Sequence, residues 1–349
     1  MVNMKINDFL NGKRKRYIIA EVSQYNDGSL GQAHAFIDAV AKTGADAIKF
    51  QTHIAEEEST LNEPFRVKFS YCDNTRYDYW KRMEFTQQQW KELCQHAIEK
   101  GLDFLSSPFS IKALEMLDQI GVPAWKFGSG EVFNDLLLKR AMQTGKPIIL
   151  STGLSTFQDI DRQVHMINES GNPLIIMECT TAYPSRPDDI PIATIPHLLK
   201  TYDCHVGISD HSATVFPSLA AVALGADVVE VHVTMSREMF GPDVKASVTM
   251  DELREIVCGT DFIQTMLTAE INKNSLDDNR VALKNIFSKS IYARKNLFAG
   301  DILSDDTMVL KKPFCESGIL VEDYEKICGK KIKNDIAKDS IISWKDVEE

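Results

Sequence analysis

Lysine and hydroxyl side chains recur in this sequence at the ends of short apolar runs, where folding would gather them. The set comprises Lys49, Ser107, Lys126, Ser129, Ser151 and Ser209. Ammonium groups combined with several short hydrogen-bond donors form a cradle for a phosphate or a carboxylate. We therefore predict a site for a small anionic substrate.

Two histidines, His211 and His232, follow neighbouring apolar runs, and the carboxylates of Glu21 and Asp210 are expected close to them. Neutral imidazoles suit a divalent transition metal, whose other ligands can be carboxylates or water. A lone histidine on a strand is more often structural, so the metal hypothesis depends on the pair facing one opening. The remaining histidines are interpreted as ordinary residues of helices, loops or strand starts: His34, His53, His96, His165, His197 and His205.

Eight short apolar runs supply the elements that would position these residues. They lie at residues 17–22, 46–51, 102–107, 124–128, 147–152, 174–180, 205–209 and 227–233. Their nearly continuous hydrophobicity is typical of parallel strands buried on both faces. Helix-period segments lie between them at 30–43, 86–100, 111–120, 155–169 and 214–224, and each ends within two residues of a glycine, which is a common helix stop signal.

This alternation of strands and helices matches a (β/α)8 barrel better than an open doubly wound sheet. A doubly wound dinucleotide-binding sheet would carry a glycine-rich turn behind its first strand, and residues 23–28 lack the G-x-G-x-x-G pattern. We therefore predict an α/β fold with a (β/α)8 (TIM) barrel.

The carboxyl ends of the strands carry the active site in such a barrel. Here nearly every strand ends in polar residues: Glu21, Lys49, Gln51, Ser106, Ser107, Lys126, Ser129, Glu131, Ser151, Thr152, Thr180, Thr181, Tyr183, Ser209, Asp210, His211 and His232. Buried polar atoms cost free energy unless they are paired. An unbroken ring of them therefore indicates an active site rather than packing.

The sequence predicts two domains joined by a polar segment. Residues 1–270 form the barrel domain and end in a long helix at 250–269; residues 271–284 form the linker; residues 285–349 form a small domain without a long helix. A long insertion between the second and third strands contains aromatic and basic runs at 65–71 and 76–82. On the active-site face of a barrel, this insertion is either a lid or an element for packing or dimerisation.

Composition excludes several classes of protein. The chain has 349 residues and a formal net charge of −11, and an acidic chain without a basic patch is a poor nucleic-acid binder. No apolar stretch approaches the roughly 18–20 residues of a membrane span, and the N-terminal segment does not have the pattern of a secretory signal. Seven cysteines without a C-x-x-C spacing indicate reduced thiols. We expect a cytoplasmic protein that binds neither nucleic acid nor membrane.

Motifs in a fixed order along the chain resemble the sialic acid synthase family, which makes N-acetylneuraminate and related nonulosonic acids such as legionaminate and pseudaminate. They are AE at 20–21, GADAIKFQTH at 44–53, SSPFS at 106–110, KFGSGE at 126–131, LSTG at 150–153, CTTAYP at 179–184, GISDH at 207–211 and GPD at 241–243. Residues 290–349 resemble the family's antifreeze-like (SAF) domain, with LFAGD at 297–301 and CGKK at 328–331. The resemblance covers almost the whole chain and implies a barrel followed by a SAF domain.

The resemblance also implies a reaction. Phosphoenolpyruvate would condense with an open-chain N-acyl-amino-sugar aldehyde, either N-acetylmannosamine or a 2,4-diacetamido-6-deoxy hexose, and phosphate would leave. In that family C3 of the enol attacks the aldehyde, whose oxygen is polarised by a divalent metal, usually Mn²⁺, with Mg²⁺ or Co²⁺ as alternatives. Water then adds to C2 and C–O cleavage expels phosphate. The family further implies a homodimer in which the small domain of one subunit covers the barrel of its partner.

Residue roles follow from the positions in these motifs. His211 and His232 would hold the metal. The phosphate would be bound by Ser107, Lys126, Ser129, Ser151, Thr181 and Ser209, with Lys284 reaching in from the domain junction. The sugar would be positioned, or protons transferred, by Glu21, Lys49, Gln51, Tyr183 and Asp243. Glu131 and Lys312 complete the expected substrate-binding set.

Three places depart from the family's pattern. Residues 22–28 read VSQYNDG where the family has Ile-Gly-x-Asn-His-Asn-Gly, and Val231 stands where the family has an arginine. Lys312 precedes Pro313 where the family supplies an arginine to the N-acyl group, and a lysine keeps that charge without the planar fork. These departures bear on the sugar more than on phosphoenolpyruvate.

Other interpretations stay open. An octulosonate-phosphate or heptulosonate-phosphate synthase would use the same barrel and phosphoenolpyruvate, but would take a phosphorylated sugar and lack the C-terminal domain. A Schiff-base aldolase would use Lys49 or Lys126 as its nucleophile. A catalytically inactive barrel would only bind a sugar or a partner, although the presence of every expected phosphate-site residue disfavours this.

Overall fold

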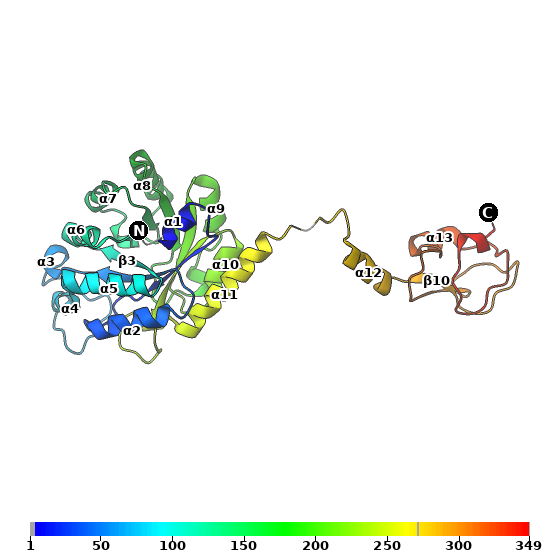
Figure 1. The fold of residues 1–349 in the computed structure, drawn as a ribbon, viewed down its shortest axis with the longest axis horizontal. Coiled ribbons are helices and arrows are strands. Elements are labelled where there is room, and N and C mark those ends of the chain that lie inside the picture. The colour runs from blue at the N-terminus through cyan, green and yellow to red at the C-terminus, as the bar shows by residue number, and fades with distance from the viewer. Residues whose placement is uncertain (1–3, 271, 349) are drawn as a thin grey trace. The chain divides into compact units, whose positions relative to one another are not determined.

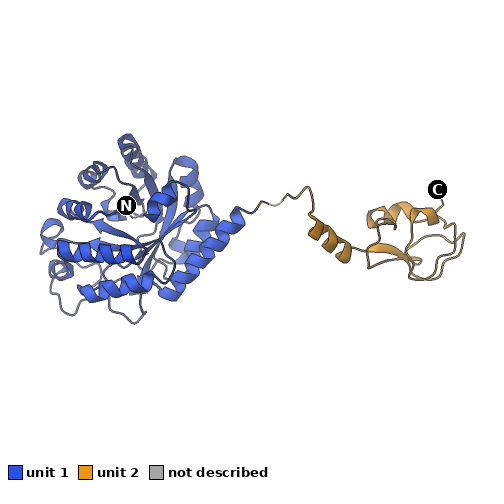
Figure 2. Ribbon diagram, viewed as in Figure 1, with its two compact units in different colours: residues 1–269 blue, residues 270–349 orange. Residues whose placement is uncertain are grey.

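The computed structural model describes residues 4–270 and 272–348 and divides the chain into two compact units (Figure 2). Unit 1 comprises residues 1–269 and unit 2 comprises residues 270–349. The division lies one residue before the end of the barrel domain expected from the sequence. No helix in the described part of the chain is long and apolar enough to cross a membrane.

Unit 1 is built around eight parallel strands (Figure 1). They are β1 (Tyr17–Glu21), β2 (Ala47–Thr52), β3 (Asp103–Pro108), β4 (Trp125–Phe127), β5 (Ile148–Ser151), β6 (Leu174–Cys179), β7 (His205–Asp210) and β8 (Val228–Thr234). Their order is β3-β2-β1-β8-β7-β6-β5-β4, with β3 and β4 in contact at the ends of this path, so the barrel is nearly closed. The short β9 (Val248–Thr249) pairs with β8. The predicted barrel and its eight strands are confirmed.

The strand register brings the polar strand ends side by side. Glu21 on β1 pairs with Lys49 on β2 and with His232 on β8. Gln51 on β2 pairs with Ser107 on β3 in the same way. Residues that are far apart in the sequence therefore meet at one end of the barrel.

Helices surround the strands. They are α1 (Lys5–Leu10), α2 (Leu30–Val40), α3 (Ala55–Glu58), α4 (Arg76–Met83), α5 (Gln87–Glu99), α6 (Ile111–Ile120), α7 (Asp135–Met142), α8 (Phe157–Ser170), α9 (Thr194–Thr201), α10 (Phe216–Ala223) and α11 (Met250–Leu267). Short 3-10 turns lie at Ser129–Glu131, Pro187–Asp189 and Val244–Ala246. The sequence did not single out α7 and α9, because eight residues are too few to display a clear helical period.

The apolar core has two layers that leave one end of the barrel polar. The larger layer lies between the strands and the surrounding helices. The smaller layer fills the amino-terminal end of the barrel, where Ile6 and Phe9 of α1 pack on Tyr17, Ile149 and Ile175. Because apolar side chains fill that end, the polar side chains collect at the carboxyl ends of the strands.

The insertion between β2 and β3 has a small core of its own. Tyr79, Trp80 and Met83 of α4 pack on Ala55 of α3, and aromatic side chains from residues 65–77 cover them. The insertion is therefore a packed element, and its residues 65–67 also line a cavity at the carboxyl ends of the strands.

Unit 2 has an apolar core that includes Ile291, Leu303, Ile332 and Ile342, and an antiparallel pair formed by β10 (Ser290–Ala293) and β11 (Met308–Lys311). Its helices are α12 (Asp278–Phe287) and α13 (Tyr324–Ile327), with 3-10 turns at Val321–Asp323 and Trp344–Asp346. Helix α12 occupies the second half of the segment expected to be a linker. Its first turn is capped by Asp277, and its apolar side chains Leu283, Ile286 and Phe287 are exposed.

Candidate active site

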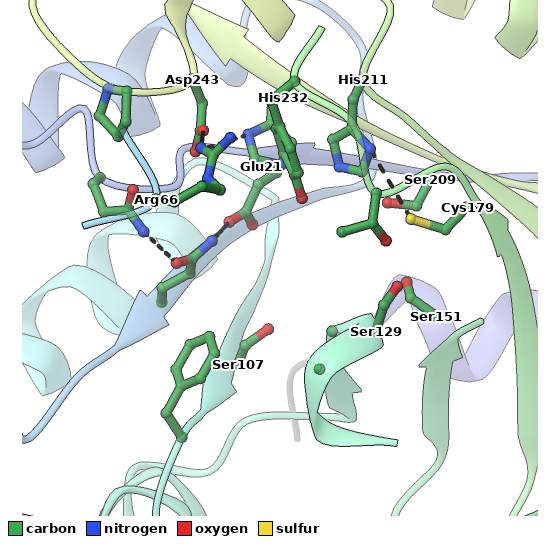
Figure 3. A pocket seen from close by; sticks show the side chains of 18 of the residues that line it. Glu21, Arg66, Ser107, Ser129, Ser151, Cys179, Ser209, His211, His232 and Asp243 are labelled. Carbon is green, nitrogen blue, oxygen red and sulfur yellow. Dashed lines mark hydrogen bonds and ion pairs between the residues drawn. The ribbon is translucent and has the colours of Figure 1, made fainter. Parts of the chain in front are cut away.

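A cavity of about 320 Å³ opens at the carboxyl ends of the strands (Figure 3). Its lining includes every predicted site residue of unit 1 except Glu131: Glu21, Lys49, Gln51, Ser107, Lys126, Ser129, Ser151, Thr181, Tyr183, Ser209, His211, His232 and Asp243. A cavity of this size accommodates small molecules. We refer to it as the main cavity.

Strand alternation decides which of the polar strand-end residues reach the main cavity. Residues two apart on a strand share a face, as do Lys49 with Gln51 and Ser209 with His211. Glu230 lies two residues before His232 and also lines the cavity, although the sequence analysis did not select it. The alternation around His232 was the signal that could have found it.

The same alternation turns other predicted ring members away from the main cavity: Ser106, Thr152, Thr180 and Asp210. Ser106 exchanges a hydrogen bond with Thr52 at 2.7 Å. Asp210 accepts the backbone N–H of Ser212 at 2.8 Å, and burial raises its pKa to about 6. The expectation that the Asp210 carboxylate joins the histidine pair is therefore wrong.

Two lysines and two carboxylates form an ionic cluster at the bottom of the main cavity, which we call the ionic floor. Lys49 Nζ lies 2.6 Å from Glu21 Oε2 and 3.7 Å from Glu230 Oε1. Lys126 Nζ lies 3.4 Å from the same Glu230 oxygen. All four side chains are at least 96% buried, so each charge depends on its neighbours for stabilisation.

The floor sets the protonation of its own members. Burial alone would lower the pKa of Lys49, but the Glu21 and Glu230 carboxylates outweigh it and raise that pKa. Burial lowers the pKa of Lys126, and Glu230 only partly opposes this. Burial disfavours the charged form of Glu230, yet the two lysines hold its pKa below the ordinary value. Lys126 is therefore the lysine of the floor that binds its proton less tightly.

Hydroxyl groups surround the two lysines. Lys126 Nζ donates to Ser151 Oγ at 2.7 Å, and Lys49 Nζ donates to Ser107 Oγ at 3.4 Å. Ser129 Oγ accepts the backbone N–H of Gly153 at 3.0 Å. A Cβ atom at Gly153 would lie 2.5 Å from Thr181 Oγ1 and 2.7 Å from the Cys179 carbonyl oxygen, so only glycine fits there. The lysines and hydroxyls form the cradle expected for an anion.

The histidine pair lies beside this cradle, with the ring centroids of His211 and His232 4.9 Å apart. His211 Nδ1 donates to the Thr180 carbonyl oxygen at 3.0 Å, which leaves the Nε2 lone pair available. Burial, and then the proximity of His232, lower the pKa of His211 to about 3, so its imidazole is neutral. His232 Nδ1 is buried and has no hydrogen-bond partner among the described residues.

These two imidazoles suit a divalent transition metal, because the ring of His211 is neutral and His232 Nδ1 is not engaged in a hydrogen bond with the described residues. The described residues contain no group of three or more His, Cys, Asp or Glu side chains arranged for a metal ion. A metal held by His211 and His232 would therefore take its other ligands from water or substrate.

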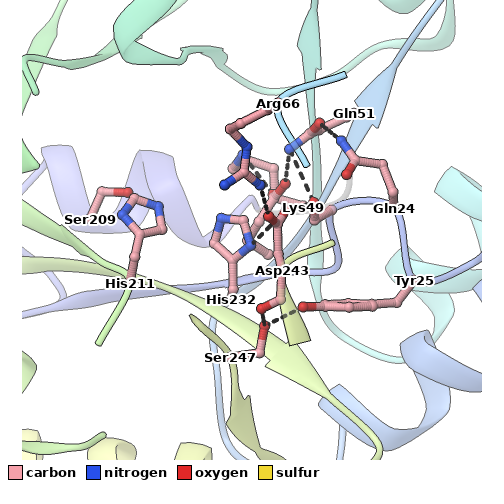
Figure 4. Close-up of polar contacts among 12 residues, drawn as sticks. Gln24, Tyr25, Lys49, Gln51, Arg66, Ser209, His211, His232, Asp243 and Ser247 are labelled. Carbon is pink, nitrogen blue, oxygen red and sulfur yellow. Dashed lines mark hydrogen bonds and ion pairs between the residues drawn. The ribbon is translucent and has the colours of Figure 1, made fainter. Parts of the chain in front are cut away.

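Arg66 from the insertion enters the main cavity, and the sequence analysis did not select it. Its guanidinium forms an ion pair with Asp243 (Figure 4). It also lies 4.4 Å from the centroid of the Tyr183 ring. Asp243 Oδ2 also accepts a hydrogen bond from the Ser23 hydroxyl, with 2.9 Å between the two oxygens. The basic and aromatic composition of residues 65–71 was the available signal, but the fold decides which cation reaches the site.

Gln51 connects the main cavity to the loop at 22–28. Its Nε2 donates to Glu21 Oε1 at 2.8 Å, and its Oε1 accepts from Gln24 Nε2 at 2.6 Å (Figure 4). Gln51 Oε1 also lies 3.2 Å from His53 Nε2. His53, interpreted from the sequence as ordinary, is instead a buried member of this network.

Three predicted site residues lie outside the main cavity. Glu131 lines an adjoining pocket, where burial raises its pKa. Lys284 lies on α12 and Lys312 directly follows β11 in the sequence, so both belong to unit 2. Lys312 Nζ lies 4.9 Å from the ring centroid of Phe287. The roles expected for Lys284 and Lys312 stay predictions.

Comparison with known proteins agrees with this geometry. Residues 36–272 match the NeuB family, and residues 288–348 match the SAF domain. The chain belongs to the NeuB family. The resemblance seen in the sequence is thus confirmed, as is a barrel followed by a SAF domain.

Individual NeuB relatives cover nearly the whole chain. The N,N'-diacetyllegionaminic acid synthase of Campylobacter jejuni is 32% identical over 94% of this chain and 99% of its own length. The N-acetylneuraminate-9-phosphate synthase of Mus musculus is 31% identical over 97% of this chain and 95% of its own. The crystal structure of N-acetylneuraminic acid synthetase from Leptospira borgpetersenii, in complex with citrate, superposes with a TM-score of 0.69 at 29% identity and covers 78% of this chain and 93% of that one.

Proposed function

We propose that this protein condenses phosphoenolpyruvate with an N-acyl-amino-sugar aldehyde, releases phosphate and forms a nonulosonic acid of the sialic type. The observation that carries the proposal is the ionic floor with its surrounding hydroxyls, buried beside His211 and His232. The sialic and legionaminic acid synthases among the relatives support the same class of reaction.

The lysines and hydroxyls are suited to the two anionic groups of phosphoenolpyruvate. Lys126 and Ser151, with Ser107, Ser129, Thr181 and Ser209, would bind its phosphate. Burial lowers the pKa of Lys126, and an incoming phosphate would favour its charged form.

The remaining residues of the cavity would act on the acceptor. C3 of phosphoenolpyruvate forms the new bond to the aldehyde carbon, and the aldehyde oxygen becomes a hydroxyl with a proton that comes from the water added at C2. Burial raises the pKa of Tyr183, so its phenol stays protonated and can donate a hydrogen bond to that oxygen. Gln51 and Asp243, the latter paired with Arg66, would hold the sugar.

Glu21 would accept the proton of the water that adds to C2. Its Oε1 receives the Gln51 amide and its Oε2 faces Lys49, so the carboxylate is oriented by both neighbours. Cleavage of the C–O bond then releases phosphate into the cradle. A divalent metal at His211 and His232, Mn²⁺ by family resemblance with Mg²⁺ or Co²⁺ as alternatives, would supply Lewis acidity to the aldehyde oxygen.

Phosphate release from phosphoenolpyruvate tests the function. The protein would be assayed with Mn²⁺ and, in turn, N-acetylmannosamine, 2,4-diacetamido-6-deoxy hexoses and phosphorylated aldoses. Release that depends on an amino sugar and is lost with a chelator is the expected result. Phosphate release only with a phosphorylated aldose that lacks the N-acyl group would favour another phosphoenolpyruvate–sugar synthase. No phosphate release with any of the sugars would contradict the proposal.

A Schiff-base aldolase is the alternative that the lowered pKa of Lys126 favours. Borohydride reduction in the presence of pyruvate separates the two mechanisms. We expect no covalent adduct, because Lys126 is engaged with Ser151 and Glu230 and the pKa of Lys49 is raised. A stable adduct at either lysine would contradict the proposed chemistry.

Lys284 and Lys312 would act in a homodimer in which unit 2 of one subunit covers the barrel of its partner. Mixing Lys312→Ala subunits with His211→Ala subunits tests this arrangement. Mixed dimers would regain part of the activity, since one of their two sites would combine an intact barrel with an intact unit 2. No recovery in a confirmed mixed dimer would contradict it.

A further inference from the structure

A second pocket of about 290 Å³ adjoins the main cavity, and we call it the side pocket. The two share Gln24, Gln51, Arg76, Trp80 and Phe109 in their walls. The remaining walls of the side pocket are His53, Glu58, Glu63 and Glu131. None of the steps proposed above uses this space.

The side pocket differs from the main cavity in charge. Three carboxylates line it, and Arg76 is the one lysine or arginine among its described lining residues. That guanidinium is already engaged, with Nε 3.3 Å from Glu63 Oε1 and Nη1 donating to the Pro64 carbonyl oxygen at 3.1 Å. A phosphate placed here would face excess negative charge. In the main cavity the cations Lys49, Lys126 and Arg66 match the lining carboxylates in number.

Glu58 supplies an acceptor that the protein leaves unused. Its side chain is 91% buried, and Oε1 lies 2.6 Å from His53 Nδ1. Its Oε2 has no hydrogen-bond partner among the described residues. A buried acceptor without a donor costs free energy, and a hydrogen bond from a ligand N–H or O–H to Glu58 Oε2 would offset that cost.

Stacked rings hold the partner of Glu58 in place. The His53 ring lies between Trp80 and Phe109, with centroid distances of 3.8 and 4.4 Å and interplanar angles of 16° and 14°. Because Gln51 Nε2 donates to Glu21, its Oε1 must face His53 and Gln24. The polar chain from Glu58 through His53 to Gln51 therefore joins the side pocket directly to the acceptor-binding wall of the main cavity.

We propose that the side pocket binds the end of the acceptor sugar remote from its aldehyde, and that it selects an acceptor whose remote end carries N–H or O–H donors and no phosphate. Only the identification of the ligand as an aldehyde sugar rests on the proposed function. Glu58, Glu63 and Glu131 are then specificity-determining residues. Gln24, in the loop that departs from the family's pattern, forms the wall between the aldehyde end and the remote end.

The test compares N-acetylmannosamine and a 2,4-diacetamido-6-deoxy hexose with N-acetylmannosamine 6-phosphate, using the full chain loaded with Mn²⁺. Phosphate release gives kcat/KM for each sugar, and calorimetry without phosphoenolpyruvate gives each Kd. We expect the better unphosphorylated sugar to exceed the phosphate ester at least about tenfold in both measurements. An ester that is bound and used equally well or better would overturn the proposal.

Three variants locate the cause of that preference. Glu58→Gln and Glu63→Gln each remove one negative charge, and the second also frees Arg76, so both should reduce the preference at least about threefold. Arg76→Gln should increase it. Glu57→Gln is the matched control, because Glu57 lies on the same helix α3 but is exposed and pairs with Lys112. Thermal melting establishes that each variant folds.

The outcomes separate this proposal from the proposed function. If phosphoenolpyruvate releases no phosphate with any sugar, the proposed function fails and calorimetry alone decides. Tighter binding of an unphosphorylated sugar, reduced by Glu58→Gln and Glu63→Gln but not by Glu57→Gln, would still support the side pocket. Equal binding, binding of no sugar, or identical effects of all three glutamate variants would overturn it.

Discussion

The ionic floor and the side pocket show two ways of placing carboxylates in one active site. On the floor, Glu21 and Glu230 come from strands and lie against Lys49 and Lys126. In the side pocket, Glu58 and Glu63 come from an insertion, and together with Glu131 they outnumber Arg76, the one lysine or arginine among the described lining residues. Balanced charges on rigid strands suit the proposed condensation, whereas unbalanced polar groups on an insertion suit recognition of a particular substrate.

Removal of the floor's central cation should have the largest effect. Lys49→Met leaves Glu21 and Glu230 buried with less compensation, so we expect a loss of about 3–5 kcal/mol in unfolding free energy and no detectable phosphate release. Denaturant unfolding and the phosphate assay measure the two effects. Lys42→Met, at an exposed position, is the control. A Lys49→Met protein as stable as the control would contradict the coupling described for the floor.

A buried carboxylate outside the floor should make the unfolding free energy depend on pH in the opposite sense to Glu230, whose pKa is lowered. Burial raises the pKa of Glu178 to about 7, so the folded state binds its proton more tightly than the unfolded state. The contribution of Glu178 to the unfolding free energy is fully present below its unfolded pKa and is lost as the pH rises through about 7. Glu178→Gln should therefore gain up to about 3 kcal/mol relative to the wild type at pH 8 and little at pH 4. Unfolding curves across this range would refute the assignment if the difference did not depend on pH.

The proposed metal site is tested at the histidine pair. His211→Ala should lower phosphate release at least about a hundredfold and weaken Mn²⁺ binding, because one of the two proposed protein ligands would be lost. Calorimetric titration with Mn²⁺ provides a readout that does not depend on turnover. His165→Ala is the matched control, since that imidazole is exposed on α8. Unchanged metal affinity together with full activity would refute the assignment.

Arg66 connects the insertion with the strands, so its removal should separate the two substrates. Arg66→Ala removes the cation beside Asp243 and Tyr183, and we expect about a tenfold rise in KM for the sugar, near 1.4 kcal/mol, with little change for phosphoenolpyruvate. Arg186→Ala removes an exposed arginine paired with Asp188 and serves as the control. Equal effects on both KM values would place Arg66 at the anion cradle instead.

The fold could be predicted because its signals are local. Runs such as 46–51 and 227–233 are apolar along their whole length, which is typical of strands buried on both faces, and they became β2 and β8. Helix α12 escaped prediction because it begins within a polar stretch, and α7 and α9 because they are short. The polar ends of the strands indicated an active site because such an unbroken ring has no structural explanation.

The candidate site could be predicted only in part. Lys49, Lys126 and His211 follow from strand ends, but the expected ring also contained Ser106 and Asp210, which the pleat turns the other way. Strand alternation separates the two faces only once the point at which each strand leaves the barrel is known.

By itself, the sequence determined the barrel, its order of strands and the chemical types gathered at their carboxyl ends, because hydrophobic runs and strand ends are encoded by neighbouring residues. The tertiary structure alone decided that Arg66 reaches Asp243, that His53 is locked between Trp80 and Phe109, and that Glu58 faces a second pocket. Those contacts join the insertion to strands and loops far away in the chain. Long-range packing, rather than local propensity, selects them.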